Sequence, residues 1–527
     1  MTQHARMAKT ILLLMASLLC TALPHAEITN ASPFEDDASP VPEQALDQYV
    51  RASLQANHLE MAPVCSDAVF IRRAFLDLIG TLPTTQEAEA FLLDTRADKR
   101  ARIIDELLER PEFTDYASMK WCDLLRVKAE FPINLWPNAV QCYARWIRES
   151  LRNHQPYDRF ARDLLTASGS NFRVPPANFY RAIQGRTPQA IAGAVALTFM
   201  GVRLEKCSKD QQSAMEHFFS RILYKKTEEW KEEIVCLDPA PATPLDTVFP
   251  DGTAVKIAPD DDPRLVFADW LLKPENPWFA ANITNRVWAW LLGRGIVHEP
   301  DDFRADNPPS NPELLKYLEG ELRGAHYDLR HLYRVILNSR TYQQSSIPRS
   351  TDPKATTLFA YYPVRRLEAE VLLDAIDRIA GSTERYSSEI PEPFSYIPET
   401  QRAITLADGS ISSPVLELFG RSPRDTGLES ERNNQTTDGQ RLYLLNATEL
   451  HKKMNSSQEL RRLFKKHQGN PQELIRLIYL RVLSRVPTRV EETTAEGHAY
   501  FWAESPEAAA EDLVWALINT KEFLYRH

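Results

Sequence analysis

The sequence contains little glycine and carries more acidic than basic side chains. Its 527 residues include 17 glycines but 36 prolines. Scarce glycine argues against a sheet-rich fold with many tight turns, and frequent proline indicates many helix starts and stops. The formal net charge of −10 disfavours a nucleic-acid-binding protein, which would need a basic face. We therefore expect a mainly α-helical protein, with two domains because the chain exceeds one ordinary core.

The motifs of several enzyme classes are also missing from the sequence. Zinc proteases carry two histidines one helical turn apart with a glutamate beside them, and no such motif occurs. His326 and His331 are five residues apart and are interpreted as structural histidines. There is no Gly-x-Ser-x-Gly elbow for a serine hydrolase and no glycine-rich phosphate loop.

The first 26 residues have the pattern of a secretory signal peptide. Arg6 and Lys9 precede the apolar run "ILLLMASLLCTAL", and "PHA" follows it. This order predicts cleavage after Ala26 and an extracytoplasmic location, in the periplasm or at the cell surface. An uncleaved anchor is the alternative, although the run is shorter than the ~20 residues that span a bilayer. No later segment is apolar enough, so we expect no membrane span after signal cleavage.

Helical patterns begin after a polar, acidic leader at residues 27–44. Thr84 and Glu87 have the spacing of a capping box, which starts a helix. The order of helix, Pro-Thr turn and Glu-bearing helix returns near the C-terminus, where Glu522 corresponds to Glu112. We interpret these segments, with a partial copy at 328–342, as repeats of a helical hairpin. Convergent amphipathic patterning would give the same picture.

A segment rich in proline and aspartate, 236–262, marks the boundary between the two expected domains, 45–235 and 263–527. Within it, "FPDGTAVKI" predicts a small β-hairpin because Asp-Gly lies between alternating apolar residues. The stretch "ITLADGSISS" predicts a second short hairpin, in the second domain.

Several stretches of the chain resemble a pair of known domains. "FIRRAFLDLIGTLPTTQEAEAFL", "PYDRFARDLL" and "ALTFMGVRLEKC" resemble the planctomycete-specific cytochrome-like domain. "NRVWAWLLGRGIV", "RRLEAEVLLDAI" and "LELFGRSPRDTGLESER" resemble the planctomycete-specific domain that usually follows it. Both are domains of unknown function. The resemblance implies a secreted protein with a secreted or cell-surface protein or a polysaccharide as partner, in polymer breakdown or surface assembly.

Many members of this family carry Cys-x-x-Cys-His after the "GVR" element, which attaches a haem covalently. In this chain Cys207 takes the first position, but Asp210 and Gln211 stand where the second cysteine and the histidine belong. One thiol cannot form both thioether bonds, and glutamine is a poor iron ligand. We therefore expect a degenerate haem-attachment position and no cofactor. Cys207 is then a buried thiol near a helix end or a disulfide partner of Cys236.

Candidate binding residues lie in two polar stretches, 285–307 and 424–446. They form either a pocket for a ligand or a divalent cation, or a buried ion-pair network in which Arg365 and Arg366 take part. The candidates are Asn285, Arg286, Arg294, Asp301, Asp302, Arg304, Arg366, Arg424, Asp425 and Glu431.

The sequence favours a binding or interaction module of an extracytoplasmic system, with no known reaction. The alternative is an extracytoplasmic hydrolase that uses the carboxylates and arginines of 286–304 and 424–432, and electron transfer comes last. A partly open pocket with perturbed carboxylates would favour the hydrolase. A dry, fully paired network would favour the module.

Overall fold

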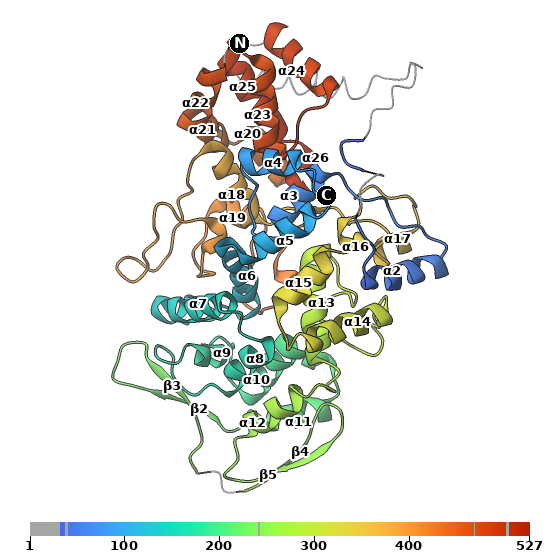
Figure 1. Ribbon diagram of the computed structural model, residues 1–527. Helices are drawn as coiled ribbons and strands as arrows, with labels where there is room; N and C mark the ends of the chain where they lie inside the picture. The colour runs from blue at the N-terminus through green and yellow to red at the C-terminus, as the bar shows by residue number, and fades with distance from the viewer. Residues whose placement is uncertain (1–31, 37–40, 241–242, 468, 502–504) are drawn as a thin grey trace.

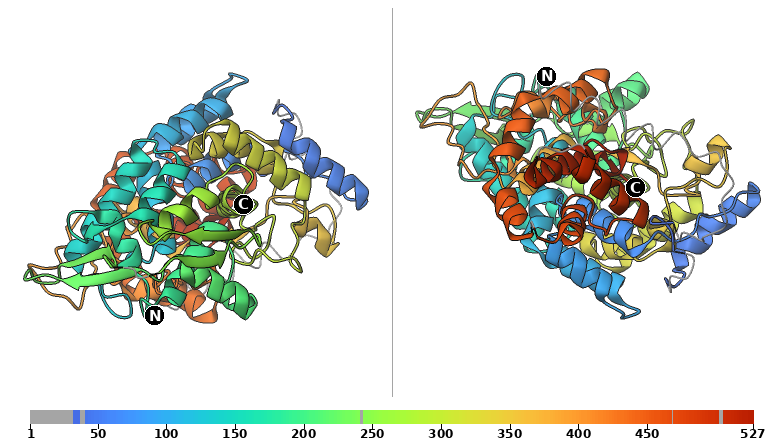
Figure 2. Two further views of the ribbon diagram at one scale, coloured as in Figure 1. Left: turned by 90° about the horizontal axis from the view of Figure 1, so that it is seen from below. Right: turned by 90° about the horizontal axis from the view of Figure 1, so that it is seen from above.

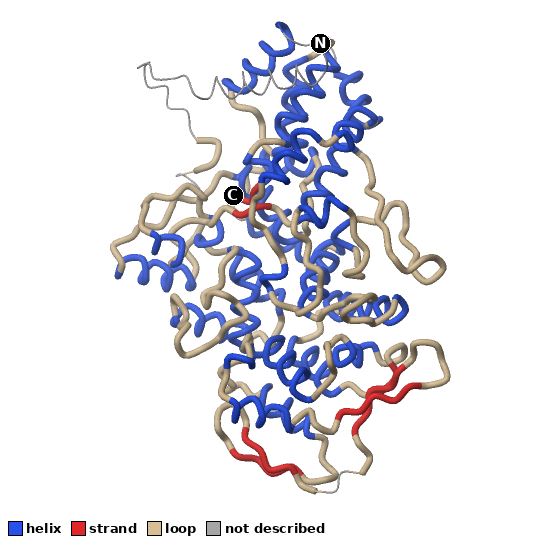
Figure 3. The backbone as a smooth tube through the Cα atoms, turned by 180° about the vertical axis from the view of Figure 1, so that it is seen from behind, coloured by secondary structure: helices blue, strands red, loops and turns tan. Residues whose placement is uncertain are grey.

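The computed structural model describes residues 32–36, 41–240, 243–467, 469–501 and 505–527 (Figure 1). Helices dominate these residues, and the strands among them form only three small sheets (Figure 3). The expectation of a mainly α-helical fold is therefore confirmed. The expected signal peptide at 1–26 lies outside the described residues.

Several helices of the first half begin with a capping side chain or with proline. Proline is the first residue of α6, α7 and α10, where its missing N–H has no intrahelical acceptor anyway. The helices are α2 (Ala45–Ala56), α3 (Asp67–Leu78), α4 (Thr85–Leu93), α5 (Lys99–Glu109), α6 (Pro111–Leu124), α7 (Pro137–Arg152), α8 (Tyr157–Thr166), α9 (Asn178–Arg181), α10 (Pro188–Val195) and α11 (Lys209–His217).

Many helices of the second half also start with proline or a cap. They are α12 (Pro263–Leu271), α13 (Phe279–Leu292), α14 (Pro312–Gly324), α15 (Leu329–Leu337), α16 (Arg340–Gln343), α17 (Pro353–Thr357), α18 (Ala369–Ala380), α19 (Pro414–Leu418), α20 (Asp438–Asn446), α21 (Thr448–Ser456), α22 (Gln458–His467), α23 (Pro471–Leu483), α24 (Arg489–Phe501), α25 (Pro506–Ile518) and α26 (Lys521–Leu524). Every residue of α13 is buried, including the polar side chains of Asn282, Asn285 and Arg286.

The hairpin predicted in the junction is present. Strands β4 (Leu245–Val248) and β5 (Ala254–Ile257) pair antiparallel, with Val248 opposite Ala254. Gly252 in the turn has a φ of 88°, a conformation that glycine adopts without strain. The other two sheets are β1 (Gly169–Ser170) with β3 (Glu233–Leu237) and β2 (Ile222–Lys226), and β6 (Arg365–Arg366) with β7 (Tyr525–Arg526).

The second predicted hairpin, in "ITLADGSISS", is wrong. This segment forms a 3₁₀ turn at Ala403–Thr405 and a single bridge from Ser412 to Ser387. The Asp408 carboxylate accepts hydrogen bonds from the backbone N–H groups of Ala129 and Ser410, and the Gly409 N–H donates to Val127 O. Tertiary contacts with the loop after α6 therefore replace the local hairpin.

Buried apolar side chains form two cores. The larger contains residues from Leu46 to Tyr362, so it runs through both sequence segments and past the proline-rich junction. The smaller contains residues from Leu367 to Phe523 and four side chains of the α3–α6 region. Figure 1 shows this second group of helices, α18 to α26, stacked against α3 and α4. The division into domains 45–235 and 263–527 stays a prediction.

The two repeated segments adopt similar helix starts. The Glu87 carboxylate accepts from the Thr84 N–H at 2.7 Å, and the Glu87 N–H donates to the Thr84 hydroxyl at 3.0 Å. Thr488 and Glu491 make the same reciprocal pair at 2.7 and 3.3 Å. The capping box expected at Thr84 is confirmed.

In each repeat one arginine pairs with two glutamates, the capping glutamate and the glutamate near the end of the repeat. Arg110 bonds Glu112 at 2.8 Å and also reaches the capping glutamate of the first repeat. Arg485 bonds Glu522 at 2.6 Å and the capping glutamate of the second. Arg110 and Arg485 lie at different positions of the two repeats. The repeats therefore share a similar set of ion pairs although the arginines do not correspond in sequence. Arg476 of α23 pairs with Glu89 of α4 at 2.8 Å, which joins the repeats.

Candidate functional site

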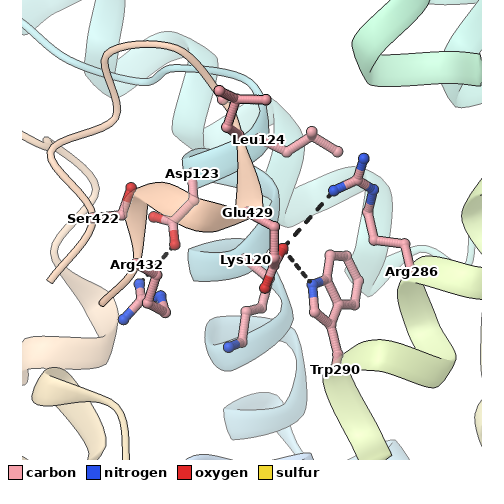
Figure 4. Close-up of a pocket in the computed structure, with 10 residues that line it drawn as sticks. Lys120, Asp123, Leu124, Arg286, Trp290, Ser422, Glu429 and Arg432 are labelled. Carbon is pink, nitrogen blue, oxygen red and sulfur yellow. Dashed lines mark hydrogen bonds and ion pairs between the residues drawn. The ribbon is translucent and has the colours of Figure 1, made fainter. Parts of the chain in front are cut away.

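A narrow cleft lies between α6 and α13, under the loop 420–437. It encloses about 300 Å³ of empty space, part of which is open to solvent. Figure 4 shows its charged side chains. The lining residues are Lys120, Asp123, Leu124, Arg286, Trp290, Ser422, Gly427, Leu428, Glu429 and Arg432.

The two predicted polar stretches meet at this cleft, through Glu429. The Glu429 N–H donates to the Asp301 carboxylate at 2.6 Å, and the Arg286 guanidinium donates to the other oxygen of Asp301 at 2.7 Å. The Glu429 carboxylate in turn accepts from the Trp290 indole N–H at 3.3 Å and lies 3.8 Å from Arg286 (Figure 4). Residues about 130 positions apart therefore share one site.

Below the cleft lies a buried ionic network that joins α6, α18 and the loop 420–437. Arg432 donates to Glu370 at 2.6 Å and to Asp123 at 2.6 Å. Arg424 donates to the second oxygen of Asp123 at 2.8 Å. Arg421 lies 3.4 Å from Glu370. The network therefore ties the first sequence segment to the second.

A second group of charges continues the network toward α3 and the C-terminal strand. Glu368 accepts from Lys120 at 2.5 Å and from Arg526. Asp77 pairs with Arg365 at 2.8 Å and with Arg526 at 3.2 Å. Lys120 thus links this group to the cleft, and it also lines a neighbouring cavity of about 260 Å³.

Three carboxylates of the network are held in their ionised form. Burial alone would raise the pKa of Asp123, but the charges of Arg432 and Arg424 outweigh burial and lower it. Burial likewise opposes ionisation of Glu370, and Arg432 lowers its pKa below the usual value. For Glu368 the opposing charges are Arg526 and Lys120, and its pKa is lowered strongly. None of these three groups is a proton donor near neutral pH.

Part of the predicted residue set belongs to this cleft and network. Arg286 lines the cleft, Asp301 lies directly behind it, and Arg424 belongs to the buried network. Asp425 bonds Lys128 at 2.7 Å. Glu431 accepts from the Thr426 N–H at 2.7 Å, and burial raises its pKa. Neither Asp425 nor Glu431 lines the cleft.

The remaining predicted residues lie elsewhere. Asp302 and Arg304 pair with each other at 2.9 Å on the surface loop. The amide of Asn285 clamps the backbone of Val297, donating to its carbonyl and accepting from its N–H. Arg366 donates to backbone carbonyls of the loop after α19. Burial lowers the pKa of Arg294, for which the described residues provide no ion-pair partner.

The sequence reasoning missed several residues of the site. Lys120 and Asp123 lie on α6 within an ordinary amphipathic pattern, and Glu370 follows the same pattern on α18. Trp290 and Glu429 fall inside the polar stretches but are not among the candidates. For Lys120 and Glu370 the only local indication is that a charged residue lies between neighbours that are buried and apolar.

The acidic loop considered for a divalent cation uses its carboxylates in ion pairs. Asp302 bonds Lys206 at 2.9 Å as well as Arg304, and Asp306 lies 3.2 Å from Arg304. No group of three or more histidine, cysteine, aspartate or glutamate side chains with the arrangement of a metal site occurs in the described part of the chain.

Gln211, at the position of the haem histidine, caps a helix. Its side chain accepts from the Ser208 N–H at 3.1 Å, and its own N–H donates to the Ser208 hydroxyl at 3.3 Å. This capping box starts α11. Cys207 precedes the cap as a half-buried free thiol, whose pKa is raised by burial, and Cys236 on β3 is also free. The interpretation of Cys207 as a thiol near a helix end fits this geometry.

A separate cluster of rings lies at one end of the molecule, in which Trp230 and Phe394 are exposed and Trp136 is half-buried. Trp136 precedes α7, Trp230 lies in the turn between β2 and β3, and Phe394 lies in the loop after α18. The Trp136 ring centroid is 6.4 Å from that of Trp230 and 5.6 Å from that of Phe394. The Lys231 ammonium lies 4.9 and 5.3 Å from the two tryptophan centroids. We call these four residues the aromatic surface, and both views in Figure 2 show the β2–β3 turn and the loop after α18 at the same end.

Comparison with protein families identifies both halves of the chain. Residues 45–229 match PSCyt2, a protein of unknown function (DUF1549), and residues 263–499 match PSD1, a protein of unknown function (DUF1553). The chain therefore contains a PSCyt2 match followed by a PSD1 match. Their order along the chain is the one expected from the sequence. The cleft is lined by residues of both matched segments. Lys120 and Asp123 lie in the PSCyt2 segment, and Arg286, Trp290 and Glu429 lie in the PSD1 segment.

No curated protein and no solved structure matches this PSCyt2–PSD1 chain. Among the residues that the structure describes, no helix combines the length and the apolar character needed to cross a bilayer.

Proposed function

We propose that this protein is an extracytoplasmic binding module that docks a secreted or cell-surface protein or a polysaccharide on its aromatic surface. The aromatic surface is the observation that carries the proposal. Trp230 is 69% exposed and Phe394 is 48% exposed. Clustered exposed aromatic side chains are typical of interaction sites, because tryptophan contributes large binding energies when a partner covers it.

The aromatic surface is built from three segments that are held in place independently. The Trp136 N–H donates to Ala129 O at 3.1 Å, and β2 and β3 fix the turn that carries Trp230. Lys231 lies over both indole rings, and no carboxylate is within ion-pair distance of it among the described residues. Rings that are already positioned lose little conformational entropy when a partner binds.

The hydrolase alternative finds less support in the geometry. Glycoside hydrolysis needs one protonated carboxyl with a raised pKa beside an ionised one. In the cleft the pKa of Asp123 is lowered, and in the network below it so are those of Glu368 and Glu370. Arginine and lysine side chains occupy their oxygens. This pattern supports a structural network that holds the PSCyt2 and PSD1 segments together.

A pull-down with a matched control tests the proposal. The double variant Trp136→Ala, Trp230→Ala removes two rings of the aromatic surface, and Leu93→Ala, Val490→Ala removes two exposed apolar side chains far from it, which are 74% and 68% exposed. We expect the wild type and the control to retain the same partner from a periplasmic or cell-surface extract, or the same polysaccharide in affinity electrophoresis. The aromatic variant should lose at least about tenfold in affinity, since a hot-spot side chain is worth ~2 kcal/mol or more.

The pull-down detects a protein partner, and affinity electrophoresis detects a polysaccharide. Equal retention by all three proteins contradicts the proposed docking surface. Hydrolysis of a retained polysaccharide by the wild type would instead favour the hydrolase.

A further inference from the structure

The cleft between α6 and α13 contains an anion position that the protein fills with one of its own side chains. Two donors face it, the Arg286 guanidinium and the Trp290 indole N–H (Figure 4). Lys120 lines the cleft from the opposite helix, with its ammonium bonded to Glu368. Glu429 lies between these three side chains, and its charge helps to raise the pKa of Lys120, although burial and Glu368 act on that group more strongly. The chemistry of this set fits a carboxylate.

Glu429 holds this position loosely. Its distances to Trp290 and Arg286 are 3.3 and 3.8 Å, whereas Arg286 bonds Asp301 at 2.7 Å. Its side chain is 36% exposed, in contrast to 0% for Asp301. An ion pair at such a distance, with its carboxylate partly in solvent, is weaker than the pair of Arg286 with Asp301.

The donor side chains of the cleft have N–H groups that are not used in hydrogen bonds among the described residues. Arg286 is 1% exposed, and its Nε–H has no hydrogen-bond partner among the described residues. Lys120 is also buried and makes one hydrogen bond, to Glu368, although an ammonium group can donate three. A buried donor without a partner costs free energy, which a bound acceptor recovers.

The buried network contains more cations than carboxylates, and the difference grows when Glu429 is not counted. Burial and the neighbouring Arg424 lower the pKa of Arg421 to about 10, as expected where positive charges crowd together. Glu429 is the most exposed of the six carboxylates. The network pairs seven cations, Lys120, Arg286, Arg365, Arg421, Arg424, Arg432 and Arg526, with Asp77, Asp123, Asp301, Glu368, Glu370 and Glu429.

The backbone of Glu429 stays anchored when its side chain leaves. Its N–H donates to Asp301 at 2.6 Å, and the 3₁₀ turn Glu429–Glu431 holds the residue at the mouth of the cleft. Rotation of one exposed side chain therefore opens the anion position without moving the loop.

We propose that the cleft formed by Lys120, Arg286 and Trp290 binds the carboxylate group of an external ligand, which displaces the side chain of Glu429. The site is distinct from the aromatic surface and does not depend on it. Glu429 lowers the apparent affinity by the fraction of molecules in which it occupies the position.

Acetate titration tests this proposal with the full chain. The protein is labelled with ¹⁵N-tryptophan, and the indole signal of Trp290, one of ten tryptophans, is identified from its loss in Trp290→Phe. Acetate should shift this signal saturably, and chloride at the same ionic strength should not. In Glu429→Ala the acetate dissociation constant should fall by roughly fivefold, which corresponds to the loss of a competing pair of about 1 kcal/mol.

Matched variants make the outcome decisive. Glu429→Gln preserves the side-chain shape but removes the competing charge, so it should also bind acetate more tightly. Glu431→Gln alters the same turn outside the cleft and should bind like the wild type. An unresponsive Trp290 signal in both the wild type and Glu429→Ala, or equal dissociation constants in the two, overturns the proposal.

Discussion

Replacement of Arg432 by methionine probes whether the buried network holds the two family segments together. Arg432 is 5% exposed and is shared between Asp123 of α6 and Glu370 of α18 at 2.6 Å each. Methionine preserves much of the volume but leaves both carboxylates short of one cation. Removing one partner of a buried ion pair costs about 3–5 kcal/mol, because the charge left behind is not compensated.

The pH dependence of Arg432→Met follows from the same residues. In the wild type, the pKa values of Asp123 and Glu370 are lowered in the folded state. Their contribution to stability is therefore present above the unfolded values of ~4 and lost only as the pH falls through the lower folded ones. Without Arg432, burial is opposed less and both pKa values rise. If the pKa of either carboxyl in the folded variant exceeds its value in the unfolded chain, the variant becomes more stable as the pH falls. The gain in the free energy of unfolding is ~1.4 kcal/mol for each pKa unit between the folded and the unfolded value.

Urea unfolding followed by circular dichroism at pH 7 and pH 5 measures both effects. We expect a deficit of about 3–5 kcal/mol at pH 7 that narrows at pH 5. The second substitution Glu370→Gln should recover about half of it, because it removes one of the uncompensated charges. Arg441→Met, at an exposed pair 3.4 Å from Asp438, should change stability by less than ~0.5 kcal/mol. A variant Arg432→Met as stable as this control, with no dependence on pH, refutes the argument.

Three further substitutions test local features. Ser208→Ala removes the capping box of α11 and should cost ~1 kcal/mol in urea unfolding; no loss would contradict the assigned cap. Gly420→Ala should cost about 1–3 kcal/mol, because Gly420 has a φ of 77° and a Cβ there would overlap the Asn433 carbonyl. Its control, Gly320→Ala inside α14 with no neighbour within 4 Å, should instead add up to ~1 kcal/mol. The purified protein should show no haem absorption band, and Cys207→Ser should leave its spectrum unchanged; a pigment that survives acid-acetone extraction contradicts this.

Features with a local cause were predictable from the sequence. The capping box at Thr84 and the hairpin around Gly252 depend on a few neighbouring residues whose types fix the backbone. The hairpin predicted from the second Asp-Gly pair, Asp408-Gly409, does not form, because the polar groups of these residues hydrogen-bond to the loop after α6. The same two residue types therefore form a turn in one place and a tertiary contact in the other.

The site could be predicted only in part, because its members come from distant segments. The polar density around Arg286, Asp301 and Glu429 was visible in the sequence, and these stretches do meet. Lys120 and Asp123 approach from α6, more than 160 residues earlier than Arg286, and no spacing rule connects them. Their charges resemble those of any amphipathic helix until the fold buries them.

Arg526 joins segments that lie far apart in the sequence. It donates to Leu76 O across 450 residues and satisfies the carboxylates of Asp77 and Glu368 inside the protein. Contacts at such a separation slow folding relative to local ones, because the loop between them must close before the contact is made. The helices have local hydrogen bonds and do not depend on this cation, whereas the contact between β7 and α3 does.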